Sequence, residues 1–354
     1  MKKSLLALAV LSAIAGAASA QSSVTMYGII DMNLQRNDPK PNGVASTTGV
    51  NSGHQSGSRF GVRGSEDLGG GLSAVFTLEN GFSGDDGTQG QGGRLFGRQV
   101  WAGLRGGFGT VALGRFALFS SGTGSFDMFG ATDPFATGFG ISSLSSTFSS
   151  VAITRVDNAA LWQSPNWGGL RLGAGYSFQA NGAEGAGSGA NNPVIFTAVN
   201  YTGGPIFAVV TYDRIKPTDA QKAAGRSDDQ THIQVGFTFD AKIAKAHLAY
   251  AKEDNQFLGS ATAANAGNDA TAWMAGVSVP LGSASLLASY QKRDGDTLGT
   301  TNADRRVWSV GASYSLSRRT NLYASYADSD GSNSINNNPT FDRKQITAGV
   351  RHSF

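Results

Sequence analysis

Arginines recur at positions where their side chains would point to the same side of an extended chain. Arg59 and Arg63 are four residues apart in one stretch of alternating side chains, so they share one face of a strand. Arg155 and Asp157 begin a later stretch, and Arg171 lies on the polar face of the next. A guanidinium stays charged even when crowded, whereas lysine can relax by deprotonation. Rings of arginine within low-dielectric walls focus a positive field and favour the passage of anions.

The stretches that carry these arginines alternate apolar and polar side chains. In the last one, Ile346, Val350 and Phe354 fall on even positions, whereas Gln345 and Ser353 fall on odd ones. A period of two predicts a strand with an apolar environment on one face and water on the other. Such stretches of about ten residues recur to the last residue, the length that a tilted strand needs to cross a bilayer. A soluble sandwich with buried aromatics is the less favoured alternative.

The alternation defines sixteen candidate strands, an even number as a bacterial single-chain barrel requires. The sequence therefore predicts an all-β fold, a transmembrane antiparallel β-barrel of sixteen strands. The expected strands are 24–36, 58–64, 72–80, 97–105, 110–116, 157–164, 170–178, 194–201, 206–214, 232–239, 244–253, 270–279, 284–291, 305–316, 322–328 and 341–354.

The connections between these strands alternate in length. Short ones contain glycine where a tight turn needs positive φ, as at 67–70, 106–109, 166–169 and 202–205. Long ones are rich in Gly, Ser, Asn and Asp, and they are expected at 37–57, 81–94, 117–156, 180–192, 216–230, 255–269 and 329–340. Short turns on one side and long loops on the other are typical of a transmembrane barrel.

For two arginines, Arg98 and Arg115, the alternation does not determine whether the side chain points into or out of the barrel. If Arg98 points inward, Val100 and Leu104 would point inward too, unless a β-bulge intervenes. Arg115 raises the same question in its own strand.

Residues 1–20 have the pattern of a cleaved signal peptide, with Lys2 and Lys3, a short apolar core and an Ala18-Ser19-Ala20 site. Residues 21–354 would then form one barrel domain. Loss of the two lysines lowers the formal charge from +3 to +3 − 2 = +1, which argues against nucleic acid as a partner. The chain has no cysteine, so neither disulfides nor thiolate metal sites are available.

The segment Ser58-Arg59-Phe60-Gly61-Val62-Arg63-Gly64-Ser65-Glu66-Asp67-Leu68-Gly69-Gly70-Gly71-Leu72 resembles the general trimeric porins of Gram-negative outer membranes, beta-proteobacterial type. Segments 24–31, 98–104 and 110–115 look like the first, fourth and fifth strands of that family, and 349–354 like its closing strand. The resemblance implies a homotrimer in the outer membrane, in contact with lipid and lipopolysaccharide. It implies passive diffusion of small ions and hydrophilic solutes, and a terminal aromatic, Phe354, that the barrel-assembly machinery reads.

In this family the third external loop folds into the barrel and narrows the pore, and here the longest connection is Ala117 to Val156. By resemblance, Arg59, Arg98 and Arg155 match the constriction arginines, opposite the loop acids Asp127 and Asp133. Those two are the only acids between residues 117 and 156, where many relatives carry more, which puts a cation preference in doubt. The expected lumen wall comprises Arg63, Arg115, Arg171, Asp31, Glu79 and Asp157.

We therefore expect weak to moderate anion selectivity. Alternatively, the arginines only form ion pairs with Asp31, Glu79 and Asp157, and the two arrangements can coexist. No catalytic, cofactor or metal site is expected, because His232 and His247 would point inward without a nucleophile motif nearby. A solute-specific channel and a surface adhesin remain as alternative functions.

Overall fold

The computed structural model describes residues 22–40, 43–121, 126, 128–136, 138–148, 154–226, 228–256, 268–295, 304–331 and 342–354. The expected signal peptide at 1–20 and the loop acid Asp127 lie outside the described residues. Within the described ranges, none of the helices is both long enough and apolar enough to cross a membrane.

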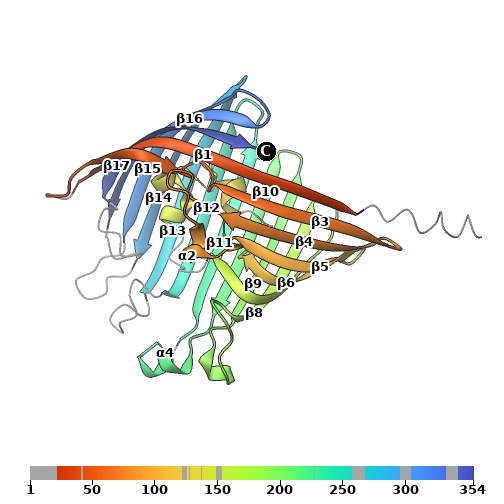
Figure 1. Ribbon diagram of the computed structural model, residues 1–354. Coiled ribbons are helices and arrows are strands. Elements are labelled where there is room, and N and C mark those ends of the chain that lie inside the picture. Colours follow the sequence, from red (N-terminus) through yellow and green to blue (C-terminus); the bar gives the residue numbers. More distant parts are fainter. Residues whose placement is uncertain are drawn as a thin grey trace, which may run out of the picture.

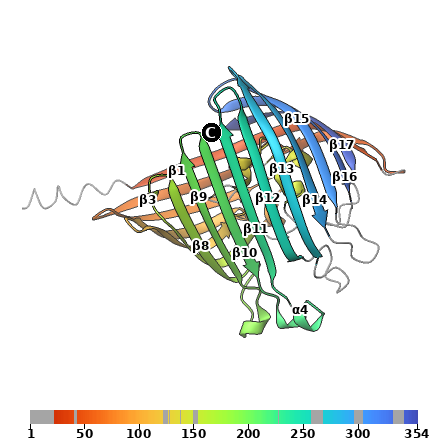
Figure 2. The same cartoon turned by 180° about the vertical axis from the view of Figure 1, so that it is seen from behind.

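One antiparallel sheet of seventeen strand segments closes on itself through pairing of β1 with β17 (Figure 1). From behind, β8 to β17 lie side by side in chain order (Figure 2). The segments are β1 (Ser23–Pro39), β2 (Thr47–Ser52), β3 (Arg59–Gly69), β4 (Leu72–Gly81), β5 (Gln99–Gly106), β6 (Gly109–Ala117), β7 (Arg155–Gln163), β8 (Leu170–Gln179), β9 (Val194–Gly203), β10 (Ile206–Ile215), β11 (Gln230–Asp240), β12 (Lys245–Gln256), β13 (Asn268–Leu281), β14 (Ala284–Gly295), β15 (Arg305–Ser315), β16 (Thr320–Gly331) and β17 (Arg343–Ser353).

The predicted count of sixteen strands is confirmed, because β2 and β3 are two parts of one barrel strand. Both run antiparallel to β1, with Ser52 opposite Met32 and Arg59 opposite Ile29. Residues 53–58 lie between them and form what we call the inner turn. The expected long loop at 37–57 is therefore wrong, since β1 extends to Pro39 and β2 occupies part of that range.

The inner turn is held by polar contacts to β1. The Asp31 carboxylate accepts a hydrogen bond from the Ser56 backbone N–H (2.6 Å), and the Asp31 N–H donates to the Ser58 hydroxyl (3.1 Å). Because side-chain oxygens here satisfy backbone groups, the strand can leave the ladder without orphaning them. No apolar alternation marks this departure in the sequence.

The predicted facings of the later strands are confirmed. On β12, Leu248 and Tyr250 are 51% and 46% exposed on the outer face, whereas His247 and Ala249, which alternate with them, are buried on the inner face. Trp308 and Tyr326 pack together on the outside, with ring centroids 5.1 Å apart. Apolar side chains thus cover the outside of the barrel, as a lipid environment requires.

The connections follow the predicted division into short turns and long loops. Gly69, Gly70 and Gly71, with φ of 84°, 61° and 78°, make the tight link between β3 and β4. The C-terminus lies at the short-turn end, opposite α4 (Asp219–Ala223) in the long β10–β11 loop (Figure 1). The remaining helices are α2 (Gly90–Gly93), α3 (Met128–Thr132), η1 (Gly140–Ser142), η2 (Leu144–Ser146) and η3 (Ser188–Ala190).

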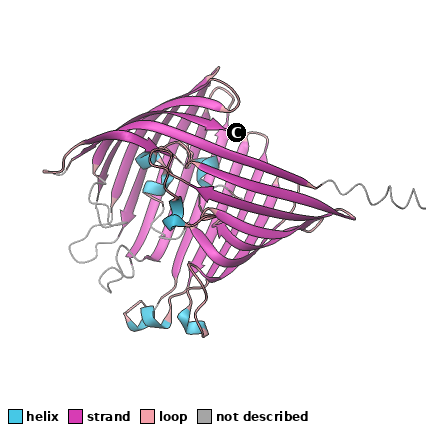
Figure 3. Ribbon diagram, viewed as in Figure 1, coloured by secondary structure: helices cyan, strands magenta, loops and turns pink. Residues whose placement is uncertain are grey.

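The loop after β6 folds into the barrel, and we call residues 118–154 the lumen loop. Figure 3 shows short helices within the ring of strands. The loop residues Phe119, Phe126 and Met128 form one buried cluster with wall residues such as Ala198 and Ala249. Burial of these aromatic and sulfur-containing side chains supplies a core that an open channel would lack.

Glycines on the inner wall make room for this loop. A Cβ at Gly173 would overlap the ring of Phe126, and one at Gly236 would overlap the Thr132 methyl group. Gly311 faces Phe135 in the same way, with 2.8 Å from the position of a Cβ to the ring. The high glycine content thus has a packing function on the inner face.

The lumen loop is also attached to the inner turn. The Phe139 backbone N–H donates to the His54 carbonyl, and the His54 ring packs between Phe139 and Tyr323, with centroid distances of 5.7 and 5.9 Å. A Cβ at Gly138 would overlap the Gln55 carbonyl oxygen. The backbone of Gly138 and the backbone of Gln55 are therefore in direct contact, and no side-chain rotation could make room for a larger residue at position 138.

We therefore expect Gly138→Ala to undock the lumen loop from the inner turn. The free energy of unfolding should fall by about 1–3 kcal/mol, as overpacking of a well-packed site does. Thermal unfolding followed by the β-sheet circular dichroism signal measures the loss, and single-channel recordings should show noisier open currents. Gly49→Ala is the control, because nothing lies within 4 Å of a Cβ there. If the two variants have equal stability and equal current noise, the contact between the lumen loop and the inner turn does not stabilise the barrel.

The buried carboxyl of Asp133 predicts that the stability of the folded chain depends on pH. Burial raises the pKa of its carboxyl to about 8, although the carboxylate accepts hydrogen bonds from the backbone of Phe135 (2.9 Å) and Leu144 (2.7 Å). The raised pKa means that the folded chain retains a proton which the unfolded chain releases above about pH 4, so stability is lost as pH rises through about 8.

The unfolding temperature should accordingly decline between about pH 4 and about pH 8 and then level off, and Asp133→Asn should flatten that decline. Asp86→Asn serves as the control, since Asp86 is an exposed loop acid whose pKa is lowered by hydrogen bonds from Thr88. An unchanged slope in Asp133→Asn would show that this carboxyl does not titrate in the folded chain.

Candidate functional site

The three predicted constriction arginines lie together on the wall formed by β3, β5 and β7. The Arg155 Nε donates to the Arg98 carbonyl (3.0 Å), and the charges of Arg98 and Arg59 are close enough to repel that of Arg155. The Arg59 Nε donates to the Gly57 carbonyl of the inner turn (2.9 Å). Neighbouring guanidiniums therefore concentrate positive charge at the level where the lumen loop is attached.

The sequence did not determine whether the Arg98 side chain points into or out of the barrel. A break in the chain just before β5 answers this question. The chain turns at Gly97, whose N–H donates to the Arg94 carbonyl (3.1 Å), and Arg98 precedes the regular strand. Its side chain therefore points inward without forcing Val100 and Leu104 inward. A Cβ at Gly81 would lie 3.0 Å from Arg98 Cδ, so this glycine leaves room for the arginine.

Glu79 neutralises one of the three guanidiniums. Its Oε1 accepts from Arg98 Nε at 2.7 Å, and its Oε2 accepts from the Tyr27 hydroxyl at 2.9 Å. Both partners of the ion pair are buried, with 6% of each side chain exposed. The expected alternative of arginine paired with a lumen acid thus holds for Arg98.

Asp31 has a different role from the expected ion pair. Its carboxylate is fully buried and accepts hydrogen bonds from the Tyr323 hydroxyl and the Ser56 N–H. The neighbouring Arg351 on β17 instead donates to the Ser56 hydroxyl (2.9 Å). Arg351 was not among the expected site residues, although its odd position in the last strand places it on the inner face.

The other two expected wall arginines lie against aromatic rings of the inner face. The Arg63 guanidinium carbon is 5.2 Å from the Tyr27 ring centroid, and that of Arg171 is 5.4 Å from the ring of Phe126. A cation over a ring face is stabilised without loss of its charge. Both residues therefore remain positive groups of the lumen.

Arg115 and Asp157 lie on the outer face, so their assignment to the lumen wall needs correction. A β-bulge is the cause: Phe116 pairs with Val156 and Gly114 with Ala159, which leaves Asp157 and Asn158 together opposite Arg115. Val156 and Phe116 are buried under the lumen loop, so the side chain between Gly114 and Phe116 points outward, as Leu113 does at 64% exposure. A bulge of this kind re-aims a side chain without a clear sequence mark.

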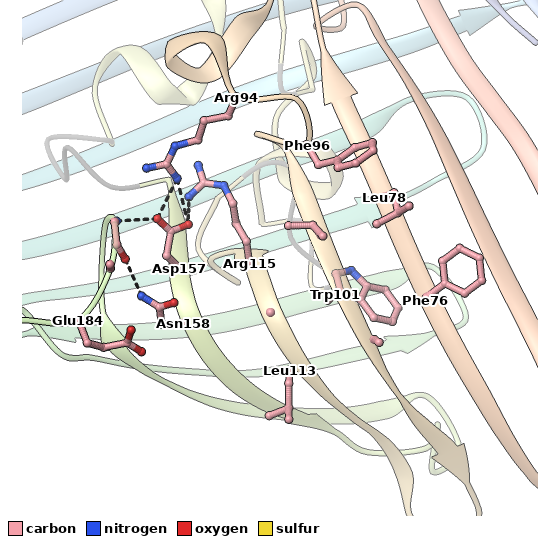
Figure 4. A pocket seen from close by; sticks show the side chains of 15 residues that line it. Phe76, Leu78, Arg94, Phe96, Trp101, Leu113, Arg115, Asp157, Asn158 and Glu184 are labelled. Carbon is pink, nitrogen blue, oxygen red and sulfur yellow. Dashed lines mark hydrogen bonds and ion pairs between the residues drawn. The ribbon is translucent and has the colours of Figure 1, made fainter.

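These two residues form an ion-pair cluster with Arg94 at the long-loop end of the barrel (Figure 4). The Asp157 carboxylate accepts from Arg115 and from Arg94 Nη1 (2.8 Å). They border a hollow of about 940 Å³ whose apolar side includes Phe76 and Leu78. Asp157 is thus paired with Arg94 and Arg115 on the outer face of the barrel.

A second group of inner-face residues fixes the far part of the lumen loop. Gln291 Nε2 donates to the Ser142 carbonyl (2.8 Å), and Arg305 Nη1 donates to that of Ser146 (3.0 Å). Arg293 pairs with Glu253, and both side chains are 1% exposed. Sequence reasoning missed this anchoring group; the inward parity of polar residues on β14 and β15 was the available signal.

Neither loop acid is shown opposite the arginines. Asp133 is buried within the lumen loop, where it accepts backbone hydrogen bonds, and Asp127 is outside the described residues. Where β3, β5 and β7 are described, the wall thus carries Arg59, Arg98 and Arg155, which we call the constriction cluster after their predicted role, with Glu79 paired to Arg98.

Comparison with known proteins places this arrangement in a family. A model described as Gram-negative porin matches residues 7–334. The chain is 35% identical to an outer membrane porin of Bordetella pertussis, over 100% of both chains. It is 34% identical to outer membrane porin protein 32 of Delftia acidovorans, over 92% of this chain and 89% of that protein.

A solved structure agrees with these relatives. The anion-selective porin from Comamonas acidovorans superposes with a TM-score of 0.74 at 26% identity, covering 94% of this chain and 100% of that one. The closed sixteen-strand barrel agrees with these similarities, and the chain belongs to the Gram-negative porin family.

Proposed function

We propose that this chain, a general diffusion channel of the Gram-negative outer membrane, favours small anions over cations. The observation that carries the proposal is the excess of arginine at the constriction. Arg59, Arg98, Arg155 and Arg351 gather there with Glu79 and Asp31 as the acids within the described part of the wall. Four positive groups against two negative ones leave a positive field.

The position of each acid adds to this field. Glu79 offsets Arg98, and Asp31 is withdrawn from the water by hydrogen bonds from Tyr323 and Ser56. Arg59 is turned toward a backbone carbonyl rather than a carboxylate. Charges in a narrow passage with low-dielectric walls act more strongly than at a flat surface. The similar Comamonas protein is named an anion-selective porin, which supports the same preference.

Family membership argues for a channel rather than an enzyme. It also makes the surface adhesin the weaker alternative, since a loop surface that bound a partner would not require an arginine-lined lumen. A solute-specific channel differs from a general one only by a binding site in the pore.

We further propose a homotrimer. A related barrel from Vibrio cholerae is described as a trimer form, at 16% identity and a TM-score of 0.65. We also propose that the assembly machinery reads Phe354, whose side chain is 45% exposed on the outer face. Its backbone exchanges two hydrogen bonds of 3.1 Å with Gly28, which joins the last residue to the first strand. Outer-membrane lipid and lipopolysaccharide would cover the remaining apolar outer surface.

Selectivity should depend on Arg59 more than on the neutralised pair Arg98 and Glu79. A unit charge about 8 Å from a permeating ion in water contributes about 0.5 kcal/mol, with opposite sign for chloride and potassium, so Arg59→Gln should reduce the chloride-to-potassium permeability ratio roughly fivefold. The double variant Arg98→Gln with Glu79→Gln removes one charge of each sign and is the matched control, with little change expected. Reversal potentials in planar bilayers measure both. A larger effect from the double variant would contradict the assignment.

The oligomeric state is tested by the mobility of the purified protein on a denaturing gel. An unheated sample should migrate as a trimer and a boiled one as a monomer, because a porin trimer resists detergent until its sheets unfold. Chemical cross-linking in detergent provides a second measurement. Monomer in both experiments would refute the homotrimer and leave the channel itself untouched.

A further inference from the structure

A hollow in the inner wall lies immediately on the short-turn side of the constriction cluster. It has a volume of about 150 Å³ and lies between β5, β6 and β7. Its main lining side chains share the parity of the inner face: Gln99, Trp101, Arg105, Thr110, Phe116 and Leu161. The hollow therefore lies on the lumen side of the wall.

The part of the wall that contains the hollow is closely packed. Gly103 falls between Trp101 and Arg105 on the inner face of β5, and a Cβ there would lie 2.7 Å from the Ala112 Cβ. The absence of a side chain at Gly103 lets β5 and β6 lie close together at this point. All residues that line the hollow belong to β5, β6 and β7, so the hollow is a feature of the barrel wall.

One side of the hollow is apolar and aromatic. Trp101 stacks on Phe116 with ring centroids 6.1 Å apart and an angle of 27° between the planes. Leu161, which is 6% exposed, and Phe116, which is 4% exposed, both belong to the buried cluster under the lumen loop. These rigid walls favour a flat apolar group.

The other side presents hydrogen-bond donors. Arg105 is exposed, and its Nε donates to the Thr110 hydroxyl (3.3 Å); both residues line the hollow. Gln99 Oε1 accepts from Trp101 Nε1 (3.2 Å), which leaves the amide group of Gln99 as a donor. Among the described residues that line the hollow, there is no carboxylate. The polar side therefore suits an anionic group.

We infer that this hollow binds small monocarboxylates that carry one aromatic ring, an inference that rests on the proposed anion pathway. A cavity of about 150 Å³ can hold a benzene ring. The ring would lie against the Trp101, Phe116 and Leu161 side chains, and the carboxylate would accept hydrogen bonds from the Arg105 guanidinium, whose planar fork matches it. Simple ions would pass the site, whereas an aromatic carboxylate would pause there.

The test uses the purified full-length channel in planar bilayers, with benzoate as the probe and acetate as its ring-free control. Benzoate should reduce the single-channel chloride current with saturation, with half of the effect at a concentration on the order of 10 mM. Acetate at equal ionic strength should change the current in proportion to its concentration only. Equal, unsaturated effects of the two anions would overturn the inference without any variant.

Two arginine variants then locate the site. Arg105→Gln should weaken the benzoate effect about tenfold, as loss of a charge-assisted hydrogen bond does. Arg63→Gln is the matched control, since Arg63 is also a lumen arginine but lies over Tyr27 on another part of the wall. Benzoate block that survives Arg105→Gln would contradict the assignment to this hollow.

The outcomes separate this inference from the proposed function. Anion-selective current without saturation by benzoate would remove the binding site and leave the anion preference. Cation-selective current with saturable benzoate block would overturn the anion preference and leave the site.

Discussion

The structure depends on one constraint, that no backbone N–H or C=O may be left unpaired in the hydrocarbon of a membrane. Pairing of β1 with β17 meets this constraint, because it removes the two edges that an open sheet would expose. Closure then separates an inner face from an outer face along every strand. The lipid-facing apolar residues and the arginines of the lumen are two consequences of the same closed ladder.

The lumen could not remain an empty cylinder and still hold a narrow passage. The lumen loop fills much of it, and the wall accommodates the loop through small residues such as Gly173, Gly236 and Ala249. The inner turn and the anchoring group around Gln291 hold the loop from two sides. In the proposed anion channel, selectivity would therefore depend on packing, because the position of the loop would determine how closely an ion approaches Arg59 and its neighbours.

The sequence predicts the regular part of this structure and misses the irregular part. Alternation identifies the barrel, its strand number and the facing of residues such as His247, because lipid and water impose opposite requirements on neighbouring positions. The inner turn is missed, since Asp31 stabilises it through tertiary hydrogen bonds. Asp157 was wrongly placed in the lumen because the bulge beside Arg115 reverses the facing without a marker residue. The grouping of Arg59, Arg98 and Arg155 came from family resemblance, as spacing alone does not bring three strands together.

The central claim is that lumen arginines make this barrel a path for anions. The reversal potential of the unmodified channel in a potassium chloride gradient tests it most directly, because its sign gives the preferred ion with no assumption about pore size. The account predicts a reversal potential with the sign expected for chloride permeation. Its magnitude should decrease at higher salt concentration, because salt screens the lumen charges. A potential with the sign set by potassium, or one of zero at low salt, would contradict it.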